Sequence, residues 1–360
     1  MADFKETGSA GSLRGVTQAM GYSNKKKSYN ILIATDFTIP ARGGIETHGY
    51  QLAQSLINLG HKVVFVTNQY KFERNGVRHM DNGLKIYYLP VKPVINGNDS
   101  FFTWWHSIPL FRQIMIREKI DILHGHMSTS IISFQASTCA QLMGIKTVFT
   151  EHSLFNFADA ASINLNKIIK WGYRDQDAAI AVSAACKDNI CLRAKIDPNR
   201  CFTIQNAVNT DLFRPSPTRT YIKSENETIN IVYISRLQFR KGVDLLIGII
   251  PEITARYPNV NFIIGGDGDK MQLLKDLVRK YQLYDRVELL GSLSHTQVCA
   301  ALNRGHIFLN TSLTESFCMA ILEAACCNLL VVSTNVGGVP EVLPDRMVYL
   351  SKPFCEDLME

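Results

Sequence analysis

The chain has 360 residues, of which 46% are hydrophobic and 19% are charged. This length and balance indicate a globular protein of about two domains and exclude a disordered, collagen-like or coiled-coil chain. The net charge is +6, and residues 1–28 hold five of the 38 basic and two of the 32 acidic residues. The remaining residues therefore carry about +3, which is too little to indicate nucleic-acid binding.

The nine cysteines include no C-x-x-C pair. We therefore expect reduced thiols rather than a disulfide framework or a zinc site. The first thirty residues lack the continuous apolar core of a secretory signal. The nearest candidate for a membrane span, Met319–Val332, is short and contains Glu323. The sequence as given predicts no spanning helix.

Strand and helix patterns alternate from residue 29 onward. Asn30–Thr35 is a predicted strand, and a predicted helix covers Ile45–Leu59, with His48 on the same face as its leucines. The further strands predicted in this half are Lys62–Thr67, Leu84–Leu89, Ile120–His124, Thr147–Thr150 and Ala178–Val182. Runs that are apolar throughout are typical of parallel strands covered on both faces.

The alternation breaks at residues 206–228, where two prolines and many turn-forming residues indicate a linker. It restarts with the strand Ile229–Ser235. The elements that follow are predicted helices at Val243–Tyr257, Lys270–Tyr281, Ser294–Asn303 and Phe317–Cys327, and predicted strands at Val260–Gly265, Arg286–Leu290, His306–Asn310 and Leu329–Ser333.

This pattern predicts an α/β fold of two Rossmann-like, doubly wound parallel-sheet domains facing across a cleft. The predicted parts are a disordered basic tail (1–28), an N-terminal domain (29–205), the linker (206–228) and a C-terminal domain (229–360).

Two loops carry groups suited to phosphate. Gly43 and Gly44 stand between the first strand and the first helix, where paired glycines let backbone N–H groups approach an anion, although a plain tight turn has the same pattern. Arg236 and Lys241 follow the first strand of the second domain and suit a diphosphate, with a solvated charge pair as the alternative.

Glu315 and Glu323 are separated by seven residues. On a helix their backbones would lie about 12 Å apart, too far for two carboxylates to share one bond but suited to the two ends of a nucleotide sugar. Glu323 lies in an apolar helix, where a charge without a partner is costly, which favours a functional over an ordinary surface role.

His152 follows the strand Thr147–Thr150, and His124 and His126 come in the same way after the apolar run Ile120–Leu123. Site residues collect at the carboxyl ends of such strands, although a structural histidine is the alternative. The stretch 265–269 fails as a dinucleotide fingerprint because Met271 stands where a glycine is needed. The aspartate pairs Asp267/Asp269 and Asp175/Asp177 lack a third ligand nearby, so no metal site is predicted.

Residues 101–105 are mostly aromatic and precede Arg112, Arg117 and Lys119. This composition is compatible with a membrane interface, and a helix packed into the core explains the aromatics nearly as well.

Together with Gly337–Glu341 (GGVPE), the glycine pair, Arg236 with Lys241, and the spaced glutamates resemble retaining glycosyltransferase family 4, which has the GT-B fold. Within it, the segments Thr147–Asp159, Asn261–Gly268 and Gly305–Pro344 resemble the PIG-A family of phosphatidylinositol N-acetylglucosaminyltransferase catalytic subunits.

The resemblance implies UDP-N-acetylglucosamine as donor and phosphatidylinositol as acceptor, in the first step of glycosylphosphatidylinositol (GPI) anchor synthesis. It implies a site on the cytoplasmic face of the endoplasmic reticulum membrane, partner subunits, and neither cofactor nor metal. The family's members continue beyond this chain's end with a packing helix and a membrane anchor, so we expect peripheral or partner-mediated attachment here. The alternatives are a family 4 enzyme with another acceptor and a truncated subunit without catalytic activity.

The resemblance also assigns roles by position. Arg236 and Lys241 would hold the donor diphosphate, Glu323 the ribose hydroxyls, and Glu315 would face the donor sugar. Gly43 and Gly44 would let the N-terminal domain close over the phosphates, and His152 would lie by the sugar and the acceptor. The family retains anomeric configuration by front-face attack, in which the donor phosphate takes the acceptor proton.

Overall fold

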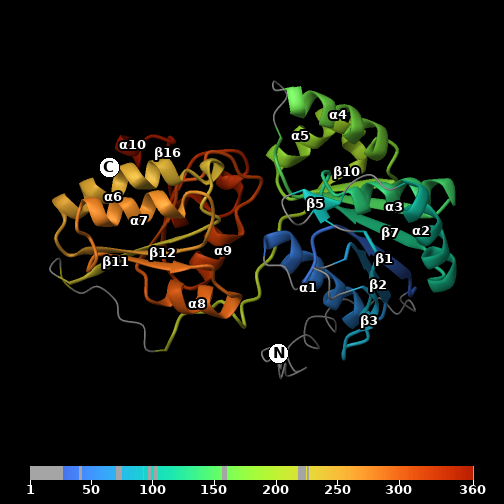
Figure 1. Ribbon diagram of the computed structural model, residues 1–360, viewed down its shortest axis with the longest axis horizontal. Helices are drawn as coiled ribbons and strands as arrows, with labels where there is room; N and C mark the ends of the chain where they lie inside the picture. The colour runs from blue at the N-terminus through green and yellow to red at the C-terminus, as the bar shows by residue number, and fades with distance from the viewer. Residues whose placement is uncertain are drawn as a thin grey trace.

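The protein is described from a computed structural model, over residues 27–39, 43–69, 75–91, 93–95, 99–100, 104–155, 160–217, 224 and 227–359. It forms two sheets, each covered by helices, that lie next to each other (Figure 1). Most of the predicted basic tail, the linker residues 218–223 and 225–226, residues 156–159 and the aromatic residues 101–103 lie outside the described residues.

The N-terminal sheet has eight strands in the order β10-β9-β8-β7-β1-β2-β4-β3. All neighbours are parallel except β3 and β4. Its strands are β1 (Asn30–Ala34), β2 (Lys62–Thr67), β3 (Gly76–His79), β4 (Lys85–Tyr88), β7 (Ile122–His126), β8 (Lys146–Glu151), β9 (Ala178–Ala181) and β10 (Cys201–Thr203). The helices are α1 (Gly44–Asn58), α2 (Trp104–Glu118), α3 (Ile131–Leu142), α4 (Ala160–Tyr173) and α5 (Ala184–Ala194), and a small ribbon joins β5 (Pro93–Ile95) and β6 (Asp99–Ser100).

The C-terminal sheet has six parallel strands in the order β13-β12-β11-β14-β15-β16, the strand order of a Rossmann sheet. Its strands are β11 (Ile229–Ile234), β12 (Val260–Gly265), β13 (Val287–Gly291), β14 (Ile307–Asn310), β15 (Leu330–Thr334) and β16 (Val348–Ser351). Its helices are α6 (Val243–Arg256), α7 (Met271–Lys280), α8 (His295–Asn303), α9 (Met319–Cys326) and α10 (Cys355–Met359). The predicted α/β fold of two doubly wound sheets is therefore confirmed.

One predicted helix boundary is wrong in a way that matters for the site. Helix α9 begins at Met319 rather than Phe317, because Cys318 has a left-handed backbone (φ 67°) that interrupts a right-handed helix. Glu315 therefore lies in the loop before α9, and the 12 Å helical spacing expected for Glu315 and Glu323 does not apply.

The two domains share one buried core. Phe149 and Tyr173 of the N-terminal domain belong to the same apolar cluster as Phe308 and Val331 of the C-terminal domain, and Phe213 from the connecting segment is buried within it. The segment is also fixed to α8 by hydrogen bonds: Asn303 donates to the Arg214 carbonyl at 3.1 Å and accepts from the Ser216 N–H at 2.6 Å. Among the described helices, none combines the length and the apolar character needed to cross a bilayer.

A buried carboxylate fixes the end of α2. Glu118 forms ion pairs with Lys62 (2.8 Å) and Lys85 (2.5 Å) and accepts a hydrogen bond from the Tyr87 hydroxyl. Burial by itself would raise the pKa of Glu118, but the hydrogen bonds from these three groups outweigh it and lower the pKa from 4.5 to about 2.

A carboxylate whose pKa is lower in the folded than in the unfolded protein stabilises the fold when the pH is above its unfolded pKa. This stabilisation is lost as the pH falls through its pKa in the folded protein. We therefore expect the free energy of unfolding to fall between about pH 5 and pH 2 by roughly 2–3 kcal/mol more in the wild type than in Glu118→Gln. Urea denaturation of both proteins across this range measures the difference. Equal pH dependence in the two proteins would show that the pairs contribute nothing.

Candidate active site between the two domains

The carboxyl ends of the two sheets face each other, with α1 and α9 between them (Figure 1). Hydrogen bonds cross this interface: Thr47 Oγ1 lies 2.8 Å from His295 Nε2, and the Ser316 hydroxyl donates to the His152 carbonyl. Residues from both domains therefore meet in one closed arrangement.

Glu341 makes the most extensive of these cross-domain contacts. Its carboxylate accepts hydrogen bonds from the backbone N–H groups of Ala184 (2.6 Å) and Ala185 (3.1 Å), in the first turn of α5. Its carbonyl accepts one from the Gln205 side chain at 2.8 Å. A carboxylate at a helix N-terminus is stabilised by the free N–H groups and the helix dipole. The last residue of the GGVPE motif thus holds the N-terminal domain against the C-terminal one.

The two glycines of that motif allow the close approach. Gly337 has a φ of 53°, and a Cβ there would lie 2.1 Å from the Glu315 carbonyl oxygen. A Cβ on Gly338 would lie 2.0 Å from the Ser316 carbonyl oxygen and 2.5 Å from the Ser183 hydroxyl. The motif therefore packs backbone to backbone against the loop that carries Glu315.

Gly43 and Gly44 lie at the N-terminus of α1, facing the C-terminal domain. Gly43 occupies the N-cap position, where a glycine has no side chain to cap the helix, and the Glu46 carboxylate of the first turn accepts a hydrogen bond from its own backbone N–H. A Cβ on Gly43 would lie 2.2 Å from Glu46 Oε2, and one on Gly44 would be 3.9 Å from the Met319 side chain across the interface. The predicted loop thus presents helix N–H groups to the cleft, the arrangement that suits an anion.

Arg236 follows β11 in a loop held by the GGDG segment that failed as a dinucleotide fingerprint. Gly266 has a φ of 129°, and a Cβ there would lie 1.8 Å from the Ser235 carbonyl oxygen. The Leu237 N–H donates to the Asp267 carbonyl at 2.9 Å. This segment therefore supports the loop that presents Arg236.

Arg236 is close enough to Glu46 of α1 to act on its charge. Burial raises the pKa of Glu46, while the hydrogen bond to its backbone and the positive charge of Arg236 lower it. Glu46 was not predicted as a site residue.

Lys241 and Glu315, predicted with separate roles, form an ion pair with each other. Glu315 also accepts a hydrogen bond from the Ser312 hydroxyl at 2.9 Å. Gly242 has a φ of 68° and lies against the backbone of Thr311, where a Cβ would come within 1.7 Å of the carbonyl oxygen. Lys241 and Glu315 are therefore positioned by contact between their own loops.

Glu323 lies on α9, and its carboxylate has no hydrogen bond or ion pair to any other described residue. It is partly buried among apolar neighbours, and this burial raises its pKa from 4.5 to about 7. The ionised form of such a carboxylate is stabilised most by a ligand that donates hydrogen bonds to it, as a pair of sugar hydroxyls does.

Four histidines cluster at the carboxyl end of the N-terminal sheet. His126 Nδ1 lies 3.1 Å from His152 Nε2, the His48 ring centroid is 4.8 Å from that of His152, and the His124 ring stacks on His126 at 4.2 Å. Burial lowers the pKa of all four below 6.5, that of His124 to about 3. They are neutral at pH 7. His48 had been predicted only as part of a helix face.

Three of these histidines, His48, His126 and His152, place their ring nitrogens within 4.8 Å of one another. Neutral imidazoles are ligands that a transition metal accepts, so these residues form the candidate metal-binding group of the described structure. The aspartates weighed from the sequence have structural contacts: Asp177 pairs with Lys146 and accepts from the Thr147 N–H, and Asp267 accepts from the Gly268 N–H.

A buried ion pair positions His152. Glu151 accepts hydrogen bonds from the N–H groups of His152 (2.9 Å) and Ser153 (3.2 Å), and its other carboxylate oxygen lies 3.7 Å from Arg193. Burial raises the pKa of Glu151, while the charge of Arg193 lowers it. The turn that presents His152 is therefore set by a fully buried pair.

Comparisons with known proteins identify the fold and the family of this chain. Residues 68–159 match a family model described as PIGA (GPI anchor biosynthesis), and residues 219–353 match the one for glycosyl transferases group 1. The fold is similar to that of sucrose-phosphate synthase from Thermosynechococcus elongatus (TM-score 0.74, 18% identity, 92% of this chain and 88% of that one). It is also similar to Anabaena HepE solved in complex with UDP (TM-score 0.68, 16% identity, 92% and 88%). These findings define a GT-B glycosyltransferase.

The sequence is 48% identical to a human protein named as a phosphatidylinositol N-acetylglucosaminyltransferase subunit, over 94% of this chain and 69% of the relative. It is 49% identical to the Arabidopsis thaliana protein of the same name over 91% of this chain and 72% of that one. The chain belongs to the PIGA family of phosphatidylinositol N-acetylglucosaminyltransferase subunits, which confirms the resemblance noted from the sequence.

Replacing Glu341 with alanine removes the acceptors of two helix N–H groups. The loss of a helix cap costs about 1 kcal/mol. If this lowers the stability of the closed arrangement, the ratio of closed to open molecules falls about fivefold. We expect amide hydrogen exchange of residues 184–186 and 151–155 to become about fivefold faster. Glu252→Ala on α6, away from the interface, is the matched control and is expected to change neither segment. Unchanged exchange in Glu341→Ala would contradict a closing role for this carboxylate.

Proposed function

We propose that this chain transfers N-acetylglucosamine from UDP-N-acetylglucosamine to phosphatidylinositol with retention of anomeric configuration, the first step of GPI-anchor biosynthesis. The observation that carries the proposal is the meeting of Arg236, Lys241, Glu315 and Glu323 of one domain with Gly43, Gly44 and His152 of the other. Family membership supports the donor and the acceptor. It also favours this acceptor over another one, and an enzyme over a chain without catalytic activity.

The donor diphosphate is proposed to bind between Arg236, Lys241 and the N-terminus of α1, whose cap residue is Gly43. When the bond from the anomeric carbon to the phosphate oxygen breaks, its electron pair stays on UDP. Two cations and oriented N–H groups stabilise that charge best in a site closed to water. The Lys241–Glu315 pair holds the ammonium in place before the donor arrives, and leaves Glu315 beside it to face the sugar hydroxyls.

Glu323 is proposed to accept hydrogen bonds from the two ribose hydroxyls. With a pKa of about 7, part of its population is protonated at neutral pH in the unbound protein. Hydroxyls that donate to the carboxylate favour its ionised form. Binding of the nucleoside therefore draws Glu323 towards the charged state.

The acceptor is proposed to enter on the same face of the sugar that the diphosphate leaves. The inositol oxygen bonds to the anomeric carbon, and its proton passes to the departing phosphate oxygen, so no protein nucleophile is required. His152 lies at the acceptor side. A neutral imidazole whose turn is fixed by Glu151 and Arg193 orients hydroxyl groups without adding a charge.

Cofactor, partners and place in the cell follow from the same proposal. The reaction uses no cofactor and no metal ion, since Arg236 and Lys241 supply the positive charge that a divalent ion gives to other transferases. Relatives are named as subunits, which supports assembly with other subunits of a transferase complex. A lipid acceptor places the enzyme at a membrane, for which we propose the cytoplasmic face of the endoplasmic reticulum.

The test is transfer of labelled N-acetylglucosamine to phosphatidylinositol in membranes that lack their native catalytic subunit but contain this chain, with EDTA present. We expect a labelled lipid from the wild type and a loss of at least 100-fold in Glu323→Ala, because a buried carboxylate contacts the donor. Glu288→Ala, an exposed glutamate on β13, is the control. Near-normal transfer by Glu323→Ala would remove Glu323 from the donor site, and no transfer by the wild type would contradict the function.

A further inference from the structure

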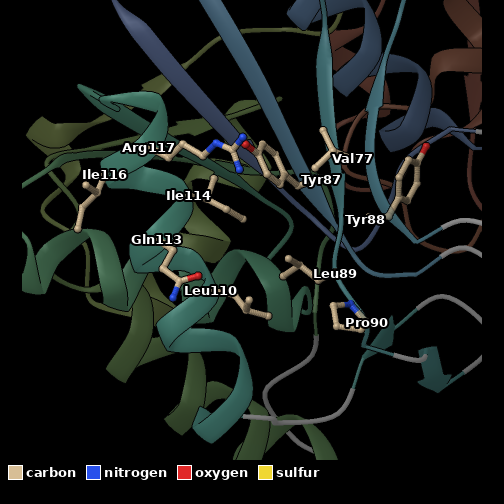
Figure 2. A pocket seen from close by; sticks show the side chains of 11 residues that line it. Val77, Tyr87, Tyr88, Leu89, Pro90, Leu110, Gln113, Ile114, Ile116 and Arg117 are labelled. Atoms are coloured by element: carbon tan, nitrogen blue, oxygen red, sulfur yellow. The ribbon is translucent and has the colours of Figure 1, made fainter.

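An apolar groove runs between β4 and α2 in the N-terminal domain (Figure 2). It has a volume of about 460 Å³, in the range of small-molecule pockets. Most of its lining is apolar: Val77, Tyr87, Leu89, Pro90, Leu110 and Ile114. Val77 on β3 and Ile116 on α2 stand at its rim with 37% and 51% of their surface exposed. The groove therefore offers apolar surface to a ligand that has few polar groups.

One end of the groove lies at the edge of the sheet that carries the active site. Strand β4 ends at Tyr88, whose hydroxyl donates to the Ile39 carbonyl at 3.2 Å. Ile39 belongs to the loop after β1 that leads to Gly43. Leu89, which follows the last residue of β4, donates its N–H to the carbonyl of Thr67 at the end of β2. A ligand that leaves this end of the groove emerges at the carboxyl edge of the sheet of the N-terminal domain.

The helix beside the groove is positively charged on its outer face. Arg112, Arg117 and Lys119 are exposed, and Arg117 lines the groove itself (Figure 2). The acid of this segment, Glu118, is buried and held by Lys62 and Lys85, so it does not offset these charges. Exposed cations next to an apolar opening complement the anionic headgroups of the membrane around the bound lipid.

We propose that this groove binds one acyl chain of the acceptor phospholipid, with Arg117 and its neighbours on anionic headgroups at the membrane surface. The inference rests on the proposed function, because it takes a phosphatidylinositol as the occupant. The polar groups that line the groove are few. The Tyr87 hydroxyl is already bonded to Glu118, which leaves a wall that an acyl chain contacts without losing hydrogen bonds. The groove thereby brings the lipid to the acceptor side of the cleft and fixes its depth in the membrane.

The first test is flotation of the purified chain with vesicles of phosphatidylcholine, with and without phosphatidylinositol. We expect binding that requires the anionic lipid and weakens with salt. Ile116→Glu should lower it about tenfold, while UDP binding and the melting temperature stay at wild-type values. Leu59→Glu, at the end of α1 with the same 51% exposure, is the matched control and should bind like the wild type. Equal binding by Ile116→Glu and the control would overturn the proposal.

The second test locates the acyl chain in the wild type and does not depend on a variant. Phosphatidylinositol that carries a photoactivatable group in its acyl chain is mixed with the protein and irradiated. Labelled peptides are then identified by mass spectrometry. We expect label in residues 85–91 and 107–119. Label confined to other segments would overturn the proposal that the acyl chain lies in the groove. Label in the groove without sugar transfer would contradict the proposed function alone. Transfer with label elsewhere would contradict the groove alone.

Discussion

Closure of the two domains is the constraint on which the site depends, because the two domains each supply part of it. The cations and spaced glutamates lie on the C-terminal domain, whereas the N-terminus of α1 and the histidines lie on the N-terminal one. A few directional contacts fix this closure: Glu341 at the first turn of α5, the Ser316 hydroxyl on the His152 carbonyl, and the continuous core around Phe213. The hydrogen bonds among them involve backbone groups, so they set position without specifying a substrate.

Burial shapes the electrostatics of the site. Desolvation keeps the four histidines neutral and raises the pKa of Glu323, whereas Glu151 is kept beside Arg193 and Glu315 beside Lys241. Breaking a buried pair is costly because the remaining charge has no partner. The Glu151–Arg193 pair therefore holds a loop in place, and the Lys241–Glu315 pair holds two of the groups proposed to meet substrate, while His152 and Glu323 are left neutral or weakly satisfied. Such a division suits a site in which negative charge develops only during the reaction.

Much of the fold was predictable because its strands are apolar runs and its parallel order follows from alternation with helices. Two of the strands that were missed are informative. Strand β3 is exposed throughout and antiparallel, and β10 is three residues long at the sheet edge. Neither is an apolar run. The start of α9 was misplaced because nothing in the residue type of Cys318 reveals its left-handed backbone.

The predicted site residues were those with a local signal, such as paired glycines after a strand or a charge in an apolar helix. His48 and Glu46 had no such local signal. On an amphipathic helix, the sequence alone does not distinguish a polar site residue from an ordinary residue of the helix face until the opposing domain is known. The pairing of Lys241 with Glu315 and the cap that Glu341 gives α5 join residues 74 and 157 positions apart. Only the tertiary structure brings such groups together.

The most direct measurement of the central claim is a crystal structure of this chain with UDP. We expect the diphosphate within hydrogen-bonding distance of Arg236 and Lys241 Nζ, opposite the N-terminus of α1, with both ribose hydroxyls on Glu323. A nucleotide bound with its diphosphate away from these cations, or with its ribose out of contact with Glu323, would contradict a donor site formed by closure of the two domains.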